Sequence, residues 1–418
     1  MTSKSETYAQ HCLITNPTIQ NRQSKIQNGA TVDFNLPEEL QLLKETVRKF
    51  VDRELIPLEH ECRPEGEDMP ERYIKPLQEK AKAIGLWLLD VPQEYGGAGL
   101  DLMSRCVIME EVARTVAIPF RYAPIFGPEV RPVLFHCNEE QKQRFLLPVI
   151  RGEKKICFAQ TEPDAGSDPA GMKTRAVKDG DHWIINGTKR FITGAKNADY
   201  AQVIAVTDPE KRARGGVTCF IVDMKAPGVT LERLWPTMMG DTPGQILFEN
   251  VRVPDSNIIG GVGQGFAIAQ SWIQEGRIRG HGARPVGIAS RALDMMIEYS
   301  KIRTTFGRPL ADRQAIQFMI ADSAMELHAC RLMVYECAWR HDRGEDVRQL
   351  SYMTKIQCAE MASRVVDHSI QVHGGLGLMR ELPLEWWYRQ LRSIRITEGT
   401  PEVLRWRLAE HIIKNHKG

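Results

Sequence analysis

The sequence lacks several features that would place it in a common class of protein. No apolar run approaches the roughly 18 residues that a transmembrane helix needs, so we expect no membrane span. The nine cysteines are scattered and none forms a CxxC pair, which argues against zinc or a disulfide framework. We therefore expect mostly small, buried, unpaired cysteines in a reducing compartment. Neither sign of charge is in excess, since the chain has 55 basic and 53 acidic residues. A net charge of +2 gives no reason to expect nucleic acid or an anionic membrane as partner.

Common nucleotide-binding and hydrolytic fingerprints are absent too. The glycine-rich stretches "GGVGQGF" and "HGGLG" both break the GxGxxG spacing, so the sequence does not support a Rossmann dinucleotide site. It contains no P-loop, HExxH or GxSxG pattern either. A metal site is therefore not expected.

The N-terminal 32 residues differ from the rest of the chain. They are polar and lack the apolar core of a secretory signal. Glu6 is the one acid in this segment, which leaves a mitochondrial transit peptide as an alternative. We expect residues 1–32 to be a disordered tail that is dispensable for catalysis.

The remaining sequence changes texture twice. Residues 33–155 carry apolar residues at helical spacing and predict an all-α region. Residues 156–262 consist of short β-branched stretches separated by turn signals, which predict an antiparallel β unit. Residues 263–418 return to long helical patterns that could form a bundle. The predicted class is α+β, in the order helical, β, helical.

Four stretches combine glycine with polar or aromatic residues: "CFAQTEPDAGSD", "WIINGTKRFITGA", "IRTTFGRPLADRQAIQF" and "QVHGGLG". Asn-Gly in the second predicts a hairpin that makes Phe191 and Thr193 neighbours on its return strand. In the third, Arg303 and Arg308 flank a Phe-Gly break between helices, where cations can bind phosphate. Each stretch also has an ordinary structural interpretation, and His373 is expected to be a surface or packed histidine.

Taken in order with a fifth stretch, "ITEGT", these four resemble the acyl-CoA dehydrogenase family. The resemblance covers Asp33 to the C-terminus; "AQTEPDAGSD" is similar to the first family signature, and "QVHGGLG" and "ITEGT" to parts of the second. It implies an all-α N-terminal domain, a β-barrel-like middle domain and a C-terminal four-helix bundle. It also implies FAD held between the middle and C-terminal domains without a Rossmann fold.

The resemblance further implies roles for individual residues, with Glu398 as the catalytic base. The flavin would be lined by Phe158, Gln160, Thr161 and Ser167, with Phe191, Ile192 and Thr193 against the isoalloxazine ring. The adenosine-diphosphate half of a FAD in a neighbouring subunit would contact Arg303, Thr305, Phe306, Gln314, Gln371, Gly374 and Gly375. Further cofactor contacts are expected at Thr400 and Glu402, and substrate contacts at Ser167, Arg277, Arg279 and Gly399.

A lone glutamate followed by glycine suits the removal of an α-proton from a thioester. The base must lie over Cα while hydride leaves Cβ for the flavin on the other side. Gly399 lets the backbone approach the thioester oxygen, where an N–H would stabilise enolate-like charge. Glu275, on the preceding helix, is the alternative base. Family members commonly have an aromatic residue where this chain has Thr397.

The arginine expected to face substrate is left open by the sequence. Arg277, Arg279 and Arg284 all lie in "EGRIRGHGARPVG", and Pro285 makes the helical register uncertain because proline removes a hydrogen bond.

The resemblance predicts α,β-dehydrogenation of an acyl-CoA thioester to the trans-2-enoyl-CoA, with electrons passed to an electron-transfer flavoprotein. It also implies a homodimer or homotetramer in the cytoplasm, or in the mitochondrial matrix of a eukaryote. Two alternatives remain. One is an oxygen-using acyl-CoA oxidase or flavin monooxygenase, of which Glu398 argues against the monooxygenase. The other is a DNA-binding relative of the fold, which the charge balance does not favour.

Overall fold

The computed structural model describes residues 34–62, 69–118, 124–211 and 214–416. It divides into two units, residues 1–42 and residues 43–418, and the second unit holds all the elements discussed below. Helix α3 (Glu38–Phe50) begins in the first unit. The predicted tail at residues 1–32 lies outside the described residues.

The N-terminal helical region continues from α3 through short helices separated by turns. An Asp101 side chain that accepts the Ser104 amide begins α5, and Asn138 and Gln141 form a reciprocal capping box at α6. The bounds are α4 (Glu71–Ala83), α5 (Leu102–Val112), α6 (Glu139–Gln141) and α7 (Leu147–Ile150).

The middle region is an eight-stranded sheet in the order β6-β7-β3-β2-β4-β5-β8, with β1 paired to β4. Its strands are β1 (Ile156–Ala159), β2 (Arg175–Asp179), β3 (His182–Ile192), β4 (Tyr200–Val206), β5 (Val217–Asp223), β6 (Val229–Leu234), β7 (Gly244–Pro254) and β8 (Ile258–Ile259). Most pairs are antiparallel, as predicted, but β1 runs parallel to β4. Strands β2 and β4 also pair in parallel, at Arg175 and Val206, so the prediction of a wholly antiparallel unit is wrong at both of these pairs. A long connection through β2 and β3 returns the chain beside β1 in the same direction.

The Asn-Gly hairpin is also a wrong prediction. Strand β3 runs straight through Asn186 and Gly187, where a register shift against β7 marks a bulge. Gly187 has φ +148°, and a Cβ there would lie 2.5 Å from Thr174 Oγ1. The glycine thus serves a bulge and a close approach, while the turn into β3 is made by Gly180 at φ +62°.

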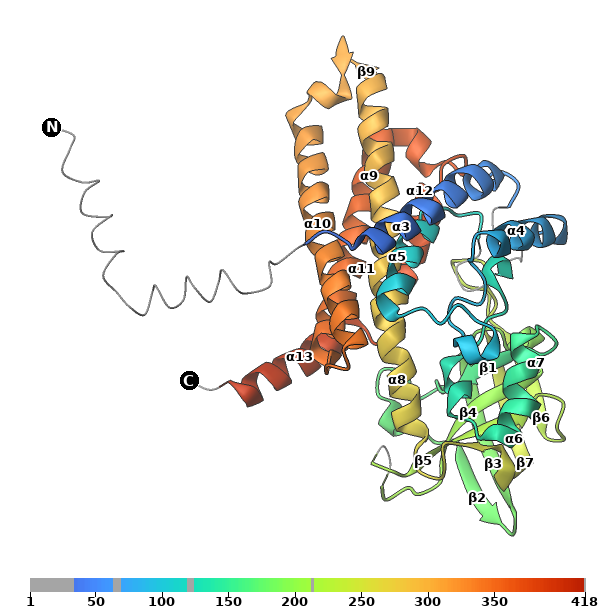
Figure 1. The fold of residues 1–418 in the computed structure, drawn as a ribbon. Helices are drawn as coiled ribbons and strands as arrows, with labels where there is room; N and C mark the ends of the chain where they lie inside the picture. The colour runs from blue at the N-terminus through green and yellow to red at the C-terminus, as the bar shows by residue number, and fades with distance from the viewer. Residues whose placement is uncertain (1–33, 63–68, 119–123, 212–213, 417–418) are drawn as a thin grey trace, which may run out of the picture. The chain divides into compact units, whose positions relative to one another are not determined.

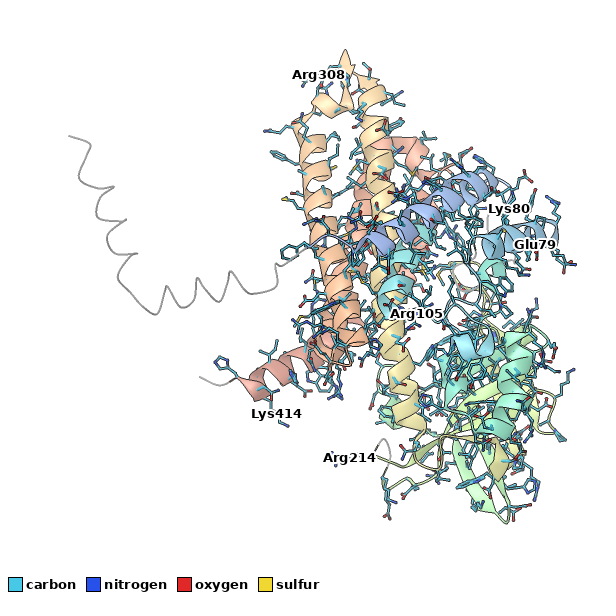
Figure 2. The ribbon with its side chains drawn as sticks, viewed as in Figure 1. Glu79, Lys80, Arg105, Arg214, Arg308 and Lys414 are labelled. Atoms are coloured by element: carbon cyan, nitrogen blue, oxygen red, sulfur yellow. The ribbon has the colours of Figure 1, made fainter. Side chains whose placement is uncertain are left out.

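The C-terminal region is a helical bundle whose long helices α9, α10 and α11 lie side by side (Figure 1). Its elements are α8 (Gly265–Ile278), α9 (Arg284–Ile302), α10 (Gln314–Asp342), α11 (Arg348–His373), α12 (Leu384–Ile394) and α13 (Pro401–Asn415). A small hairpin, β9 (Thr304–Thr305) and β10 (Arg308–Pro309), joins α9 to α10, with Arg308 near its tip (Figure 2). The predicted α+β class, with a sheet between two helical regions, is confirmed.

Pro285 does not break the first long helix of the bundle. A π-helical turn, Arg279–Ala283, joins α8 to α9, and Pro285 lies in the first turn of α9. In a regular helix the proline ring would crowd the carbonyl of His281, four residues earlier, and the wider turn relieves that contact. This settles the register that the sequence left open.

The cysteines behave as predicted where the structure describes them. Eight are free and buried, among them Cys106, Cys330, Cys337 and Cys358 in the core of the bundle. Burial raises the pKa of most of these thiols, so they are packing residues rather than nucleophiles. Cys12 lies outside the described residues.

Candidate active site

Glu398 lies on the short connection between α12 and α13, in an unusual backbone conformation. Its φ is +55°, and the next residue, Gly399, has φ +99°. A left-handed glutamate is rare, because its Cβ crowds the backbone, and it persists only where the surroundings hold it. Thr400 then caps α13 by accepting the Val403 amide, and Pro401 occupies the first helical position. The chain therefore fixes Glu398 at a strained turn immediately before a well-capped helix.

Two buried cations brace this turn through its carbonyl oxygens. Arg277 Nε on α8 donates to the Glu398 carbonyl at 2.8 Å. Lys355 Nζ on α11 donates to the Gly399 carbonyl at 2.7 Å and to the Arg395 carbonyl at 3.3 Å. Burial lowers the pKa of Lys355 to about 8, which Glu398 partly opposes. Lys355 was not identified from the sequence, since a lysine within a long helix looks like a surface residue.

The carboxylate of Glu398 rests against α8 at a glycine. A Cβ on Gly276 would lie 2.6 Å from Oε2 and 2.9 Å from Oε1, so no other residue fits there without moving the carboxylate. Oε2 is also 3.2 Å from His281 Nδ1 in the π-turn. Neither Gly276 nor His281 was identified from the sequence.

Glu275, the alternative base, faces elsewhere. Its carboxylate lies 3.1 Å from Arg105 of α5, a residue labelled in Figure 2. Successive helical residues point about 100° apart, so the neighbour of Gly276 cannot share its direction. The structure therefore corrects this alternative: the position on α8 that faces Glu398 is Gly276.

The structure also separates the competing arginines. Arg277 reaches the Glu398 turn and lies over the Tyr352 ring at 5.2 Å, and burial lowers its pKa. Arg279 instead pairs with Asp90; burial opposes its charge, but Asp90 outweighs that and raises its pKa. Arg284 begins α9 beyond the π-turn. Of the three, Arg277 is the one that contacts the candidate base.

The "AQTEPDAGSD" stretch is anchored by a buried ion pair. Lys189 of β3, fully buried, lies 2.8 Å from Glu162 and donates to the Gln160 carbonyl at 3.0 Å. Glu162 also accepts the amides of Lys173 and Thr174. Burial lowers the pKa of Lys189 to about 8, against the pull of Glu162. The pair fixes the loop after β1 onto the end of β3.

We expect Lys189→Met to destabilise the protein, because it leaves Glu162 buried without its cation. Removing one partner of a buried pair typically costs about 3–5 kcal/mol. The measurement is urea unfolding of the wild type and the variant. Lys173→Met is the matched control, since that lysine pairs with Asp164 on the surface and its loss should cost under about 1 kcal/mol. Equal, small effects of both changes would contradict the anchoring role.

The end of β3 carries features that fit a flat, polar ring. Phe191 has φ +60° and is 55% exposed, so its ring stands out from the sheet. Beside it, the Arg190 amide donates to the Thr161 carbonyl, and Gln160 Oε1 is buried with no hydrogen-bond partner among the described residues. In the same loop, a Cβ on Gly166 would meet nothing within 4 Å. These residues fit the isoalloxazine that the resemblance implies.

Other residues of the first flavin group are placed differently. Phe158 contacts Trp272 of α8, with ring centroids 4.7 Å apart. Ser167 is exposed in the loop before a short helical turn at Pro169. The side chain of Ile192 is 2% exposed and packs in the sheet core, so the expectation that it packs against the ring is wrong for the side chain. Thr193 follows the strand at its end.

The second group of expected cofactor residues lies at the other end of the bundle. Tyr299 near the end of α9 stacks on His373 at the end of α11, with centroids 4.4 Å apart. This stacking joins the two segments that carry Arg303, Thr305, Phe306, Gln314, Gln371, Gly374 and Gly375. Phe306 is 98% exposed. The expectation that His373 is a packed histidine is confirmed, since it is buried and bonded to the Ser369 carbonyl.

Within a single chain, the residues expected at the flavin ring and those expected at the adenosine-diphosphate half lie apart. The β9–β10 hairpin and the sheet lie at opposite ends of the long helices (Figure 1). The 19 residues of α9 alone span about 28 Å. Glu402, in the first turn of α13, is exposed and belongs to neither group.

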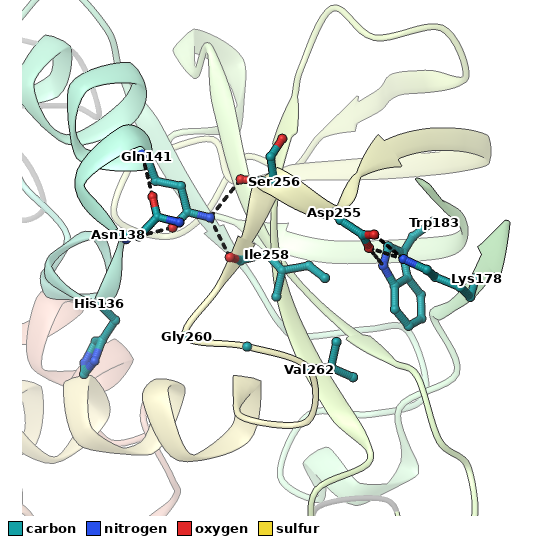
Figure 3. A pocket seen from close by; sticks show the side chains of 11 residues that line it. His136, Asn138, Gln141, Lys178, Trp183, Asp255, Ser256, Ile258, Gly260 and Val262 are labelled. Atoms are coloured by element: carbon teal, nitrogen blue, oxygen red, sulfur yellow. Dashed lines mark hydrogen bonds and ion pairs between the residues drawn. The ribbon is translucent and has the colours of Figure 1, made fainter. Parts of the chain in front are cut away.

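An open depression of about 780 Å³ lies apart from these residues, between the sheet and the α6 region (Figure 3). Several of its polar groups are already paired: Gln141 Nε2 donates to the Ser256 and Ile258 carbonyls, and Trp183 Nε1 donates to Asp255. None of the residues predicted from the sequence lines it. Within the described ranges, no cluster of three or more His, Cys, Asp or Glu could hold a metal ion, and no helix is long and apolar enough to cross a membrane.

Comparison with known families accounts for almost the whole chain. Residues 37–153 match the acyl-CoA dehydrogenase N-terminal domain, 157–251 its middle domain and 263–413 its C-terminal domain.

Individual relatives agree. The 3-(aryl)acrylate reductase of Clostridium sporogenes is 38% identical over 90% of this chain and 99% of its own. The mitochondrial short-chain specific acyl-CoA dehydrogenase of Homo sapiens is 36% identical over 91% and 92%. The caffeyl-CoA reductase-Etf complex subunit CarC of Acetobacterium woodii is 37% identical over 88% and 96%.

Solved structures show the same fold. Butyryl-CoA dehydrogenase from Megasphaera elsdenii superposes with a TM-score of 0.79 at 32% identity, over 91% of this chain and all of that one. The FAD complex of PigA superposes with a TM-score of 0.82 at 27% identity, over 92% of this chain and all of that one.

Proposed function

Because the chain belongs to the acyl-CoA dehydrogenase family and is an FAD-dependent oxidoreductase, we propose that it dehydrogenates an acyl-CoA thioester between Cα and Cβ. The product is the trans-2-enoyl-CoA, and Glu398 is the base that removes the α-proton. The observation that carries this assignment is the strained Glu398 turn, braced from behind by Arg277 and Lys355.

The residues of this chain hold and aim the base. The side chains of Arg277 and Lys355 donate to the backbone carbonyls of Glu398 and Gly399, so these two bonds fix the turn through its backbone. The Gly399 amide, next to the base, is the candidate donor to the thioester oxygen, where it would stabilise enolate-like charge. Bound FAD supplies the acceptor for the hydride that leaves Cβ. Phe191, Thr161 and Gln160 are the residues of this chain that would hold its ring.

The distant position of the second cofactor group supports a shared cofactor. The β9–β10 hairpin, which carries the exposed Phe306, lies at the opposite end of the long helices from the sheet that carries Phe191. We therefore propose a homodimer or homotetramer in which this hairpin contacts the adenosine-diphosphate half of the neighbour's FAD. Such sharing links cofactor affinity to assembly by mass action.

We propose an electron-transfer flavoprotein as the physiological redox partner. One relative is named as a subunit of a reductase–Etf complex, and an electron-transferring flavoprotein study supplies a solved structure with a TM-score of 0.79 at 32% identity. Names of relatives include both dehydrogenases and reductases, so the reaction should be tested in both directions.

The direct test is anaerobic mixing of the yellow protein with a panel of saturated acyl-CoAs, scored by bleaching of the flavin. The reduced protein is then mixed with the corresponding enoyl-CoAs, including aryl ones, and scored by recovery of colour. Bleaching by at least one thioester is the expected result. Reduction by none of them, or reoxidation by oxygen as fast as by the flavoprotein partner, would contradict the proposal.

We expect Arg303→Ala to lower FAD occupancy and to weaken the oligomer together, because both depend on the same contact. Occupancy is read from the absorbance ratio of flavin to protein, and assembly from sedimentation at several concentrations. Lys301→Ala is the control: this exposed lysine lies two residues before Arg303 and pairs with Glu298. A wild-type protein that sediments as an FAD-loaded monomer would refute the shared site.

A further inference from the structure

His281 brings its ring into contact with both the helix and the loop of the candidate active site. It lies in the π-turn Arg279–Ala283, and its side chain is 8% exposed. Nε2 lies 2.8 Å from Thr397 Oγ1. Nδ1 lies 3.3 Å from the Gly276 carbonyl oxygen and 3.2 Å from Glu398 Oε2. One imidazole therefore spans the space between α8 and the Glu398 turn.

The neighbours of the ring decide which nitrogen carries hydrogen. Nδ1 faces a carbonyl and a carboxylate, and an ionised carboxylate has no hydrogen to donate, so we assign the N–H to Nδ1. Nε2 faces a hydroxyl, which can donate or accept. Thr397 Oγ1 is also 3.3 Å from the Ser393 carbonyl, but its contact with His281 is the shorter. In the neutral ring, Thr397 donates to Nε2 and Nδ1–H points at the two oxygens.

From this geometry we propose that His281 is a positioning residue for Glu398, with Thr397 fixing its tautomer. The inference rests on the proposed role of Glu398 and adds a residue to it. The Nδ1–H dipole beside Oε2 stabilises the ionised carboxylate and holds it over the substrate, because a donor next to a charged group in a poorly solvated site acts strongly.

The proton balance leaves His281 unchanged. The Cα–H bond breaks and an O–H bond forms at Glu398. The electron pair stays with the substrate and becomes the Cα=Cβ bond as hydride leaves Cβ for the flavin. His281 keeps its Nδ1 hydrogen throughout, so it orients the base and does not relay the proton.

The π-turn is what delivers the ring. Two other π-turns, Val51–Leu55 and Lys142–Leu146, lie in the N-terminal helical region, so this turn matters here for where it places His281. The turn also packs closely: a Cβ on Gly282 would lie 2.9 Å from Thr354 Cγ2 and 3.2 Å from Val334 Cγ2. Glycine here lets the turn press against α10 and α11, which holds His281 toward Glu398.

Other charged groups face the same carboxylate and must be held constant in a test. Arg277 from α8 and Lys355 from α11 both interact with Glu398 electrostatically. Neither is changed in the variants below, so a difference between those variants reports on the ring at position 281.

The experiment compares His281→Asn with His281→Gln. The amide nitrogen of asparagine can take the place of Nδ1, whereas that of glutamine reaches the place of Nε2. We expect the glutamine variant to reduce its flavin roughly 10- to 100-fold more slowly in anaerobic stopped flow with a saturating acyl-CoA, the range typical of losing a hydrogen bond to a charged group. The asparagine variant should stay within about fivefold of wild type, an estimate from the same range.

The pH dependence distinguishes positioning from a merely structural role. Without the donor, the carboxylate takes up a proton more readily, so the acidic limb of the rate profile should move to higher pH in His281→Gln and stay near wild type in His281→Asn. FAD content and melting temperature should be alike in the two. His368→Asn, at a partly buried histidine that bonds to Ser323 and lies thirteen residues beyond Lys355 on α11, is the control and should change neither rate nor profile.

Equal rates of the two variants, or an acidic limb that does not move in His281→Gln, would overturn the inference. If His281→Gln fails to bind FAD, Thr397→Val decides instead: slower reduction supports the tautomer argument and a wild-type rate refutes it. Glu398→Gln separates a failure of the role proposed for His281 from a failure of the role proposed for Glu398. Near wild-type bleaching by that variant would show that another group is the base, which refutes the role of Glu398 and with it that of His281, whereas bleaching of the wild type by no thioester would refute the dehydrogenation itself.

Discussion

Replacing Glu398 by glutamine should leave a folded, yellow protein that an acyl-CoA no longer bleaches at a useful rate. The turn at Glu398 is held by bonds to its backbone carbonyl and to that of Gly399, which glutamine keeps. The α-proton, however, loses its acceptor, and loss of a general base typically costs about two to four orders of magnitude. The measurement is anaerobic flavin reduction by stopped flow with the best thioester of the panel.

Glu398→Asp refines this test, because it keeps the carboxylate but withdraws it by roughly one C–C bond. A misplacement on the order of 1 Å can cost about a hundredfold, so aspartate should fall between wild type and glutamine. Glu410→Gln, an exposed glutamate further along α13 that pairs with Arg407, is the control and should keep the wild-type rate. If Glu398→Gln bleaches as fast as wild type, another group is the base. Glu275 would be a poor second choice, because it pairs with Arg105.

The parts of the site that the sequence predicted are those in which neighbours along the chain do the work. Glu398 and Gly399 are adjacent, so a short motif can mark their turn, although Arg277 and Lys355 from distant helices hold its conformation of φ +55° and +99°. The same holds for the loop after β1, whose Glu162 is eleven residues from the Lys173 amide that it accepts. Local composition also sufficed for the change from helix to strand and back, because periodicity is a property of single segments.

The parts that the sequence could not supply depend on distance along the chain. His281 lies 116 residues from Thr397, and Lys355 lies 44 residues from Gly399, and neither pairing leaves a local pattern. The prediction of an Asn-Gly hairpin failed for a related reason. The same dipeptide can form a hairpin turn or a bulge, and here the pairing of β7 along β3 decides for the bulge. The π-turn was hidden because Pro285 signals a break but not how the chain accommodates it.

The space around the carboxylate leads to the second large expected effect. Gly276→Ala should impair catalysis without weakening the fold. Gly276 lies within α8 at a helical conformation, where alanine is normally more stable than glycine by about 0.5–1 kcal/mol. The added Cβ, however, would come within 2.6 Å of Oε2 and 2.9 Å of Oε1 of Glu398. Both atoms end a flexible side chain, so the carboxylate moves and the helix stays.

We therefore expect Gly276→Ala to melt at or slightly above the wild-type temperature and to retain its FAD, while flavin reduction falls roughly a hundredfold, the loss typical of misplacing a catalytic group by about 1 Å. The control is Gly280→Ala, the same substitution four residues later, where a Cβ would meet nothing within 4 Å. It should keep the wild-type rate.

A double variant tests whether the loss comes from that one contact. Combining Gly276→Ala with Glu398→Asp, whose shorter side chain avoids the new methyl, should restore part of the activity. A wild-type rate in Gly276→Ala would mean that the carboxylate does its work away from α8, and the geometry assigned to the base would have to be abandoned.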